Sequence, residues 1–197
     1  MTKTFCVALT AVAVSCFSAV AAFAAPDPSQ PVIAVSAAVK QVARGASAAS
    51  QEAAIRQVLH DDFDLAYSAR QALGAHWDAA TPEQRVRFLA AIETSEARAY
   101  RERLGMLSGA TVAIEKITPR GAGAWTVESN VDALGDLPPL HLSWEIHDGG
   151  QGPRIVDVKV AGVSLFMTRR SEFNAVIQKS GGSIEPLVAQ LESRASR

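Results

Sequence analysis

The spacing of apolar side chains changes twice along the chain, and each change marks a different kind of element. Apolar residues recur every three to four positions in segments 35–43 and 51–59, in a segment beginning near residue 65, and over 82–104, which predicts four helices. Between residues 111 and 160 the spacing falls to two, as expected for strands. After residue 162 the helical spacing returns, and a last helix is predicted over 184–193.

Several of these helices carry recognisable start signals. Thr81 and Gln84 have the spacing of a capping box, in which each side chain accepts the backbone N–H of the other residue. Asp62 or Asp64 is expected to cap the helix that begins near residue 65, and Ser183 to cap the last helix. These signals place helix starts independently of the apolar spacing.

Strict alternation of apolar and polar side chains identifies the strands, as where Leu142 and Trp144 alternate with Ser143 and Glu145. The predicted strands span residues 111–118, 125–131, 140–147 and 154–160. Because the spacers between them are short and contain glycine or proline, neighbouring strands are expected to be antiparallel. The sequence therefore predicts an α+β fold, in which an antiparallel sheet of about four strands is covered on its apolar face by N- and C-terminal helices.

Composition excludes several classes of protein. With 48% hydrophobic and 20% charged residues, the 197-residue chain is too apolar for a disordered protein. Its 19 basic and 20 acidic residues leave no basic excess, so a dedicated nucleic-acid binder is not expected. The mean hydropathy of +0.10 is high for a soluble protein, and the N-terminus explains part of it.

The first 24 residues resemble an export signal. Lys3 is followed by an apolar run over residues 5–20 and by Ala22-Phe23-Ala24, which predicts a signal peptide over 1–24, cleaved after Ala24. The run is also long enough for an uncleaved membrane anchor. Cys6 and Cys16 both lie in this segment, so the mature chain would contain no cysteine; lipid attachment at Cys16 is a further alternative. Residues 25–50 are predicted as a lead and helix, and 51–197 as the main domain.

Candidate catalytic chemistry is sparse. His60 with Asp62 is the one candidate acid/base pair, although capping and solvation explain these residues equally well. His141, Glu145 and His147 share one face of a predicted strand, but positions six apart on a strand lie about 20 Å from each other, too far for a shared metal.

Two further features leave both a functional and a structural interpretation open. Arg169 and Arg170 could contact a phosphate, or could simply form a solvated helix face. The large apolar residues could form either a packed core or the wall of a cavity, because composition does not distinguish the two. Apart from these features, the chain lacks a G-x-S-x-G elbow, a P-loop, a Rossmann fingerprint and an H-E-x-x-H motif.

A family resemblance adds to this picture. The stretch DVKVAGVSL at 157–165, followed by RSEF at 170–173, resembles the signature of the MlaC family of periplasmic phospholipid-binding proteins, also called toluene-tolerance auxiliary components of ABC transporters. Matching positions upstream are Phe63-Asp64, Leu73-Gly74, Trp77, Thr81 to Gln84, Phe88 and Tyr100. The resemblance covers residues 52–193, and it extends to a similar branch associated with hopanoid biosynthesis.

The resemblance implies a curved antiparallel sheet whose helices enclose a deep apolar pocket for acyl chains. It also implies periplasmic transfer of a phospholipid or related lipid between an outer-membrane lipoprotein complex and an inner-membrane ABC transporter with an MCE-domain subunit. It does not imply an enzyme, and no cofactor or metal is expected. By analogy with other helix-on-sheet pockets, the residues expected at the pocket wall are Phe88, Ile92, Tyr100, Trp125, Val127, Leu142, Trp144, Val158, Val160 and Phe173.

Two other classes of function remain open on the sequence. One is an enzyme with a cone-shaped α+β fold, which would use His60 and Asp62. The other is a structural or adaptor protein with a fully packed interior. The volume and lining of any internal cavity would separate these classes from a lipid carrier, because a lipid site needs at least several hundred Å3.

Overall fold

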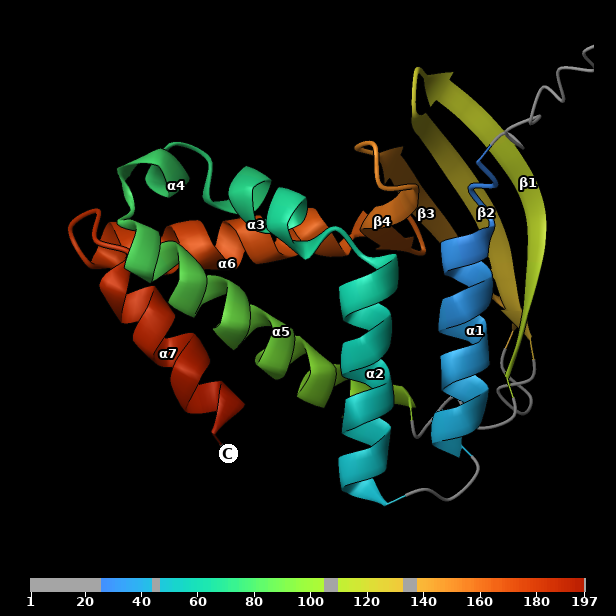
Figure 1. The fold of residues 1–197 in the computed structure, drawn as a ribbon, viewed down its shortest axis with the longest axis horizontal. Coiled ribbons are helices and arrows are strands. Elements are labelled where there is room, and N and C mark those ends of the chain that lie inside the picture. The colour runs from blue at the N-terminus through green and yellow to red at the C-terminus, as the bar shows by residue number, and fades with distance from the viewer. Residues whose placement is uncertain (1–25, 44–46, 105–109, 133–137, 197) are drawn as a thin grey trace, which may run out of the picture.

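The computed structural model describes residues 26–43, 47–104, 110–132 and 138–196, and its elements follow the predicted order of helices, strands and helices (Figure 1). The N-terminal helices are α1 (Gln30–Ala43), α2 (Ala48–Asp62), α3 (Leu65–Leu73), α4 (Ala75–Ala79) and α5 (Pro82–Leu104). The strands are β1 (Thr111–Gly121), β2 (Ala124–Asp132), β3 (Leu140–Asp148), β4 (Pro153–Val160) and β5 (Val163–Ser164). Helices α6 (Leu165–Lys179) and α7 (Glu185–Ala195) follow. The signal peptide predicted over residues 1–24 lies outside the described residues.

The strands form one antiparallel sheet in sequence order, from β1 to β5, which confirms the predicted α+β fold. The sheet curves around α1 in Figure 1. The two-residue strand β5 was not predicted. It is joined to β4 by Ala161 and Gly162, whose φ angles of 49° and 82° are both positive, as a tight type I′ hairpin requires. This turn brings the chain back beside β4 just before α6 begins.

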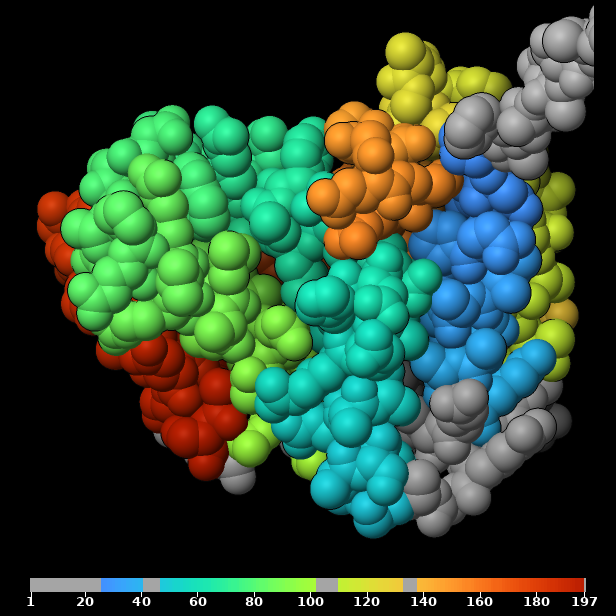
Figure 2. Space-filling model, in the orientation of Figure 1, coloured from blue at the N-terminus to red at the C-terminus, as the bar shows by residue number. Residues whose placement is uncertain are grey.

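Helix α1 lies against the inner face of the sheet with α2 beside it (Figure 1), and both helices lie at the front of the molecule in Figure 2. Helices α3 to α7 lie beside β4 on the other side of α2 (Figure 1), and α5 packs against α2. No helix in the described residues combines the length and the apolar character needed to cross a bilayer. The helix predicted within residues 25–50 is α1, which packs against the sheet through Val32.

The buried apolar side chains form three clusters. One joins the sheet to α1, with Val32 packed near Trp144 and Ile146. A second lies among α3, α5, α6 and α7 and contains Phe88 and Phe173. The third links α2 to α5. The interior is thus divided into three packed regions.

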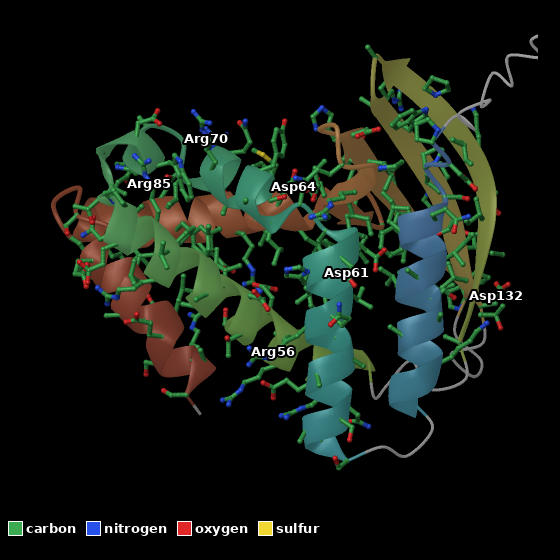
Figure 3. All side chains as sticks on the ribbon, viewed as in Figure 1. Arg56, Asp61, Asp64, Arg70, Arg85 and Asp132 are labelled. Atoms are coloured by element: carbon green, nitrogen blue, oxygen red, sulfur yellow. The ribbon has the colours of Figure 1, made fainter. Side chains whose placement is uncertain are left out.

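The predicted capping box is confirmed at the start of α5. The backbone N–H of Gln84 donates to Thr81 Oγ1 at 3.1 Å, and the N–H of Thr81 donates to Gln84 Oε1 at 3.0 Å. Of the two aspartates considered for α3, Asp64 is the cap, since it accepts the N–H of Tyr67 at 2.8 Å (Figure 3). Asp62 instead lies in the last turn of α2.

The start of α7 differs from the prediction. The N-cap position is Ile184, and no side chain caps it. Ser183 lies one residue earlier, where its Oγ accepts the N–H of Glu185 at 3.3 Å. The short helix α4 was also not predicted, because its five residues give too few positions for a helical period to be recognised.

An ion-pair network fastens α7 to α5. The Arg87 guanidinium binds Glu192 through two nitrogens, both at 2.8 Å, and Glu185 through a third at 2.7 Å. Gln84 also donates to Glu185, at 3.0 Å. Hydrogen bonds from Gln84 and Arg87 lower the pKa of Glu185, and those from Arg87 lower the pKa of Glu192. Both carboxylates are therefore stabilised in the ionised form by folding.

Replacing Arg87 with glutamine should lower the melting temperature at neutral pH. The melting temperature of the variant should also fall less steeply than that of the wild type as the pH is lowered. Because folding lowers both carboxyl pKa values from about 4.5, the stabilisation is present above that pH and disappears as the pH falls through the lowered folded values. Thermal denaturation across an acid series measures this effect. Arg170→Gln, which removes an exposed arginine of α6, should follow the wild type. If the melting temperatures of the wild type and R87Q fell in parallel as the pH was lowered, the interpretation would be contradicted.

Candidate functional site

An apolar cavity of about 360 Å3 lies between α1, α2 and the inner face of the sheet. This volume falls within the range of small-molecule sites, roughly 300–1,000 Å3. On the sheet side it is lined by Val112, Val131, Leu140, Leu142, Trp144, Val158 and Val160. On the helix side it is lined by Val35, Ala38, Val39, Ile55, Val58 and Leu59. No charged side chain is among the described residues of this wall.

A second cavity, of about 200 Å3, adjoins the first on the side of α3, α5 and α6. The two cavities share five wall residues, which are Leu59, Phe63, Tyr100, Val158 and Leu165. Unlike the first, the second cavity has charged side chains in its wall, namely Glu96, Asp157, Arg169 and Glu172, together with the hydroxyls of Ser68 and Thr168. The site therefore passes from an uncharged, mainly apolar end to an end that carries charge.

A buried hydrogen bond fixes one side of the apolar cavity. Trp144 Nε1 donates to Ser129 Oγ at 2.8 Å, and Ser129 is fully buried on the inner face of β2. A tryptophan buried among aliphatic side chains needs a partner for its N–H, because a buried donor without one is costly. The hydroxyl of Ser129 supplies that partner, so the indole ring is held against the cavity.

The signature stretch at 157–165 positions the start of α6. Asp157 accepts hydrogen bonds from Ser164 Oγ at 2.6 Å and from the N–H of Phe166 at 3.0 Å. Ser164 is in turn the N-cap of α6 and accepts the N–H of Met167 at 2.9 Å. These bonds tie the helix to β4 and place Leu165 at the wall shared by both cavities.

Of the residues expected at the pocket wall, five line the first cavity, namely Tyr100, Leu142, Trp144, Val158 and Val160. Ile92 and Phe173 line the second cavity. The structure thus brings seven of the ten expected residues to the two cavities, from β3, β4, α5 and α6.

Phe88, Trp125 and Val127 line neither cavity among the described residues. Phe88 is fully buried and meets the Phe173 ring edge to face, with the ring centroids 5.6 Å apart. Val127 is fully buried in the sheet cluster, against which Trp125 packs.

Sequence reasoning did not identify the contribution of α1 and α2 to the wall. Val35, Ala38 and Val39 of α1 face the first cavity, as do Ile55 and Leu59 of α2. Their helical spacing was the available signal, since each set repeats every three or four residues. That spacing identifies an inward-facing stripe, but it does not distinguish a packed core from a cavity.

The candidate acid/base and metal residues lie outside both cavity walls. His60 Nδ1 is 2.9 Å from Asp61 Oδ1, and both side chains are more than half exposed, so the acidic neighbour of His60 is Asp61. Burial raises the pKa of Asp62. On the outer face of the sheet, His141 Nε2 lies 3.0 Å from Glu128. In the part of the chain that the structure describes, no three metal-ligating side chains come together.

The fold and its two cavities define an α+β protein with an apolar space between its helices and its sheet, and comparison with known proteins identifies the family. The family model described as "MlaC protein" matches residues 32–193. The chain therefore belongs to the MlaC family. Its fold is similar to that of a solved phospholipid-binding protein from Ralstonia solanacearum in complex with a phospholipid, with a TM-score of 0.70 and 24% sequence identity. The match covers 85% of this chain and 93% of the other.

Replacing Ser129 with alanine should destabilise the fold by about 1–3 kcal/mol, because the buried indole N–H of Trp144 loses its acceptor. Urea denaturation measures the change. Ser143→Ala is the matched control: Ser143 lies on the outer face, where its hydroxyl donates to Glu128 at 3.1 Å and is only partly buried, and its loss should cost less than about 1 kcal/mol. An equal loss of unfolding free energy in the two variants would show that the buried Trp144–Ser129 hydrogen bond stabilises the fold no more than the Ser143–Glu128 bond on the outer face.

Proposed function

We propose that this protein carries a phospholipid or a related lipid, with the acyl chains held in the apolar cavity between α1, α2 and the sheet. The observation that supports this most strongly is the wall of that cavity, which draws apolar side chains from all four long strands and from both covering helices. Membership of the MlaC family and the fold of the phospholipid-bound relative from Ralstonia solanacearum point the same way.

The physical need for such a carrier follows from the hydrophobic effect. Each methylene removed from water contributes about 0.8 kcal/mol, so a dozen methylenes contribute roughly 10 kcal/mol. A free diacyl lipid therefore crosses an aqueous gap too slowly to be useful unless its chains are covered. A cavity without charged groups in its wall covers acyl chains at no cost of polar desolvation.

The proposed setting is the periplasm, reached through the signal peptide over residues 1–24. The proposed partners are an outer-membrane lipoprotein complex and the MCE-domain subunit of an inner-membrane ABC transporter, between which the lipid is moved. The family assignment supports these proposals. A binding role is also favoured over an enzymatic one, because the exposed His60–Asp61 pair lies apart from both cavities.

Protein purified from a periplasm that contains lipids should retain a bound lipid. Native mass spectrometry of the intact protein, followed by extraction, should show one added mass and identify it as a diacyl phospholipid, a hopanoid or another lipid. Protein that is lipid-free after purification, and that takes up no lipid from vesicles, would contradict the proposal.

Replacing Leu142 with arginine should abolish lipid uptake while the protein stays folded at ambient temperature. The new charge would enter the apolar cavity and require desolvation beside the acyl chains. Ser143→Arg places the same group on the outer face of the same strand, beside Glu128, and should bind lipid normally. Uptake of fluorescent phospholipid from vesicles, with circular dichroism as the folding check, measures both. Equal loss of folding and binding in L142R would favour a packed core.

A further inference from the structure

One segment forms part of the cavity wall on one side and an exposed apolar surface on the other. Residues 163–167 lead from β5 into the first turn of α6. Leu165 lines both cavities, and Phe166 lines the second. Val163 and Met167 instead face solvent, with 60% and 52% of their surface exposed. A single thickness of chain therefore separates this exposed surface from the site.

Val163 and Met167 form one apolar surface at the start of α6, which we call the α6 patch. Met167 donates its N–H to the hydroxyl of Ser164, the N-cap residue, at 2.9 Å. In the hydrophobic staple, the residue before an N-cap lies against the first turn of its helix, and Val163 has that position. Val163 also directly follows the tight turn at Ala161 and Gly162, so the patch lies at an edge of the sheet.

The closeness of two large apolar side chains distinguishes the α6 patch from other exposed apolar positions. Isolated exposed apolar residues are ordinary on protein surfaces. Among the described residues, the other large apolar side chains that are exposed come from four different elements, and they are Ile33 of α1, Tyr67 of α3, Val86 of α5 and Ile117 of β1. The α6 patch instead places two such side chains within five residues of chain.

The charge beside the α6 patch is positive. Four residues share a side of the helix with the patch at spacings of three or four, and they are Arg170, Ser171, Asn174 and Gln178. They include a cation and no acid. Arg170 is exposed and makes no hydrogen bond or ion pair with the residues that the structure describes. The acids on either side are already engaged, because Asp157 accepts from Ser164 and Glu172 binds Arg169.

We propose that the α6 patch is the surface through which this protein contacts an anionic lipid bilayer. Val163 and Met167 enter the headgroup layer, and Arg170 faces the negative charges of the lipids. This inference rests on the proposed lipid-carrier function and adds to it the place where the carrier meets a membrane. Because Leu165 and Phe166 lie directly behind the patch, a lipid at this contact has a short path to the cavities.

A lipid surface suits the α6 patch better than a protein partner does. Two apolar side chains and one arginine cover much less than the roughly 800 Å2 that each side of a stable protein interface buries. Apolar side chains beside a cation are typical of surfaces that lie on anionic membranes. So small a contact binds weakly and reversibly, which a carrier requires because it must leave the membrane after each exchange.

The test is co-sedimentation of the protein with phosphatidylcholine vesicles that contain or lack phosphatidylglycerol. The double variant Val163→Glu, Met167→Glu should bind phosphatidylglycerol vesicles about tenfold or more weakly than the wild type, because apolar burial is lost and two acids face anionic lipid. The double variant Ile33→Glu, Val86→Glu is the matched control, since it adds the same charge at exposed apolar positions of other elements, and it should retain most of the binding.

The contribution of Arg170 is tested separately by Arg170→Gln. This variant should lose binding to vesicles that contain phosphatidylglycerol and should keep the wild-type level on phosphatidylcholine alone, because the charge of the lipid is what the arginine recognises. An equal change on both kinds of vesicle would overturn the role of Arg170 at an anionic surface.

Lipid loading from detergent solution separates the α6 patch from the cavity. V163E/M167E should load fluorescent phospholipid from detergent as the wild type does, and should take it up more slowly from vesicles. A wild type that loads lipid from detergent but binds no vesicles would overturn the membrane contact, favour a protein occupant of the patch and leave the carrier function standing. A wild type that loads lipid from neither source would remove the carrier function itself.

Two further outcomes would also overturn the proposal. One is a loss of vesicle binding in I33E/V86E as large as that in V163E/M167E, which would show an effect of added charge alone. If V163E/M167E does not fold by circular dichroism, the variant Val163→Ser, Met167→Gln removes the apolar surface without adding charge. Unchanged vesicle binding in that variant is the second such outcome.

Discussion

The structure depends on keeping an apolar space open inside a small protein. On the scale observed for empty core cavities, about 24 cal/mol per Å3, a void of about 360 Å3 would cost roughly 9 kcal/mol if it stayed empty and dry. That is comparable to the whole free energy of unfolding of a typical domain, about 5–15 kcal/mol. The surrounding framework must therefore resist collapse, and a hydrophobic occupant would recover much of the cost.

Polar contacts supply much of that resistance, and they lie at the edges of the apolar space. Ser129 holds the Trp144 indole on the sheet side, and Asp157 with Ser164 ties α6 to β4. Because hydrogen bonds and ion pairs have fixed geometry, they define wall positions that apolar contacts alone would leave free to close. The family signature at 157–165 thus contains the hydrogen bonds that hold α6 against β4, beside the apolar wall.

Local patterns in the sequence predicted most of the fold, because local physics determines those features. The capping box at Thr81 and Gln84 and the alternation in β3 involve residues within four positions of each other. The contacts that shape the site join residues far apart in the chain, as between Arg87 and Glu192, and no local pattern marks them. In the sequence, Ser129 is simply a polar residue with no sign of its burial, and the apolar stripes of α1 and α2 have the pattern of an ordinary core. The difference between a wall and a packed interior lies in the spacing between elements, which the sequence does not display.

The division of the interior into three apolar clusters has a mechanical consequence. Each cluster has its own buried contacts, and the two cavities lie where the clusters meet, with Phe63 packed against both the sheet cluster and the α2–α5 cluster. Because more than one cluster contributes to the wall of each cavity, the volume of the site depends on how the clusters are placed relative to one another as well as on the packing inside each one.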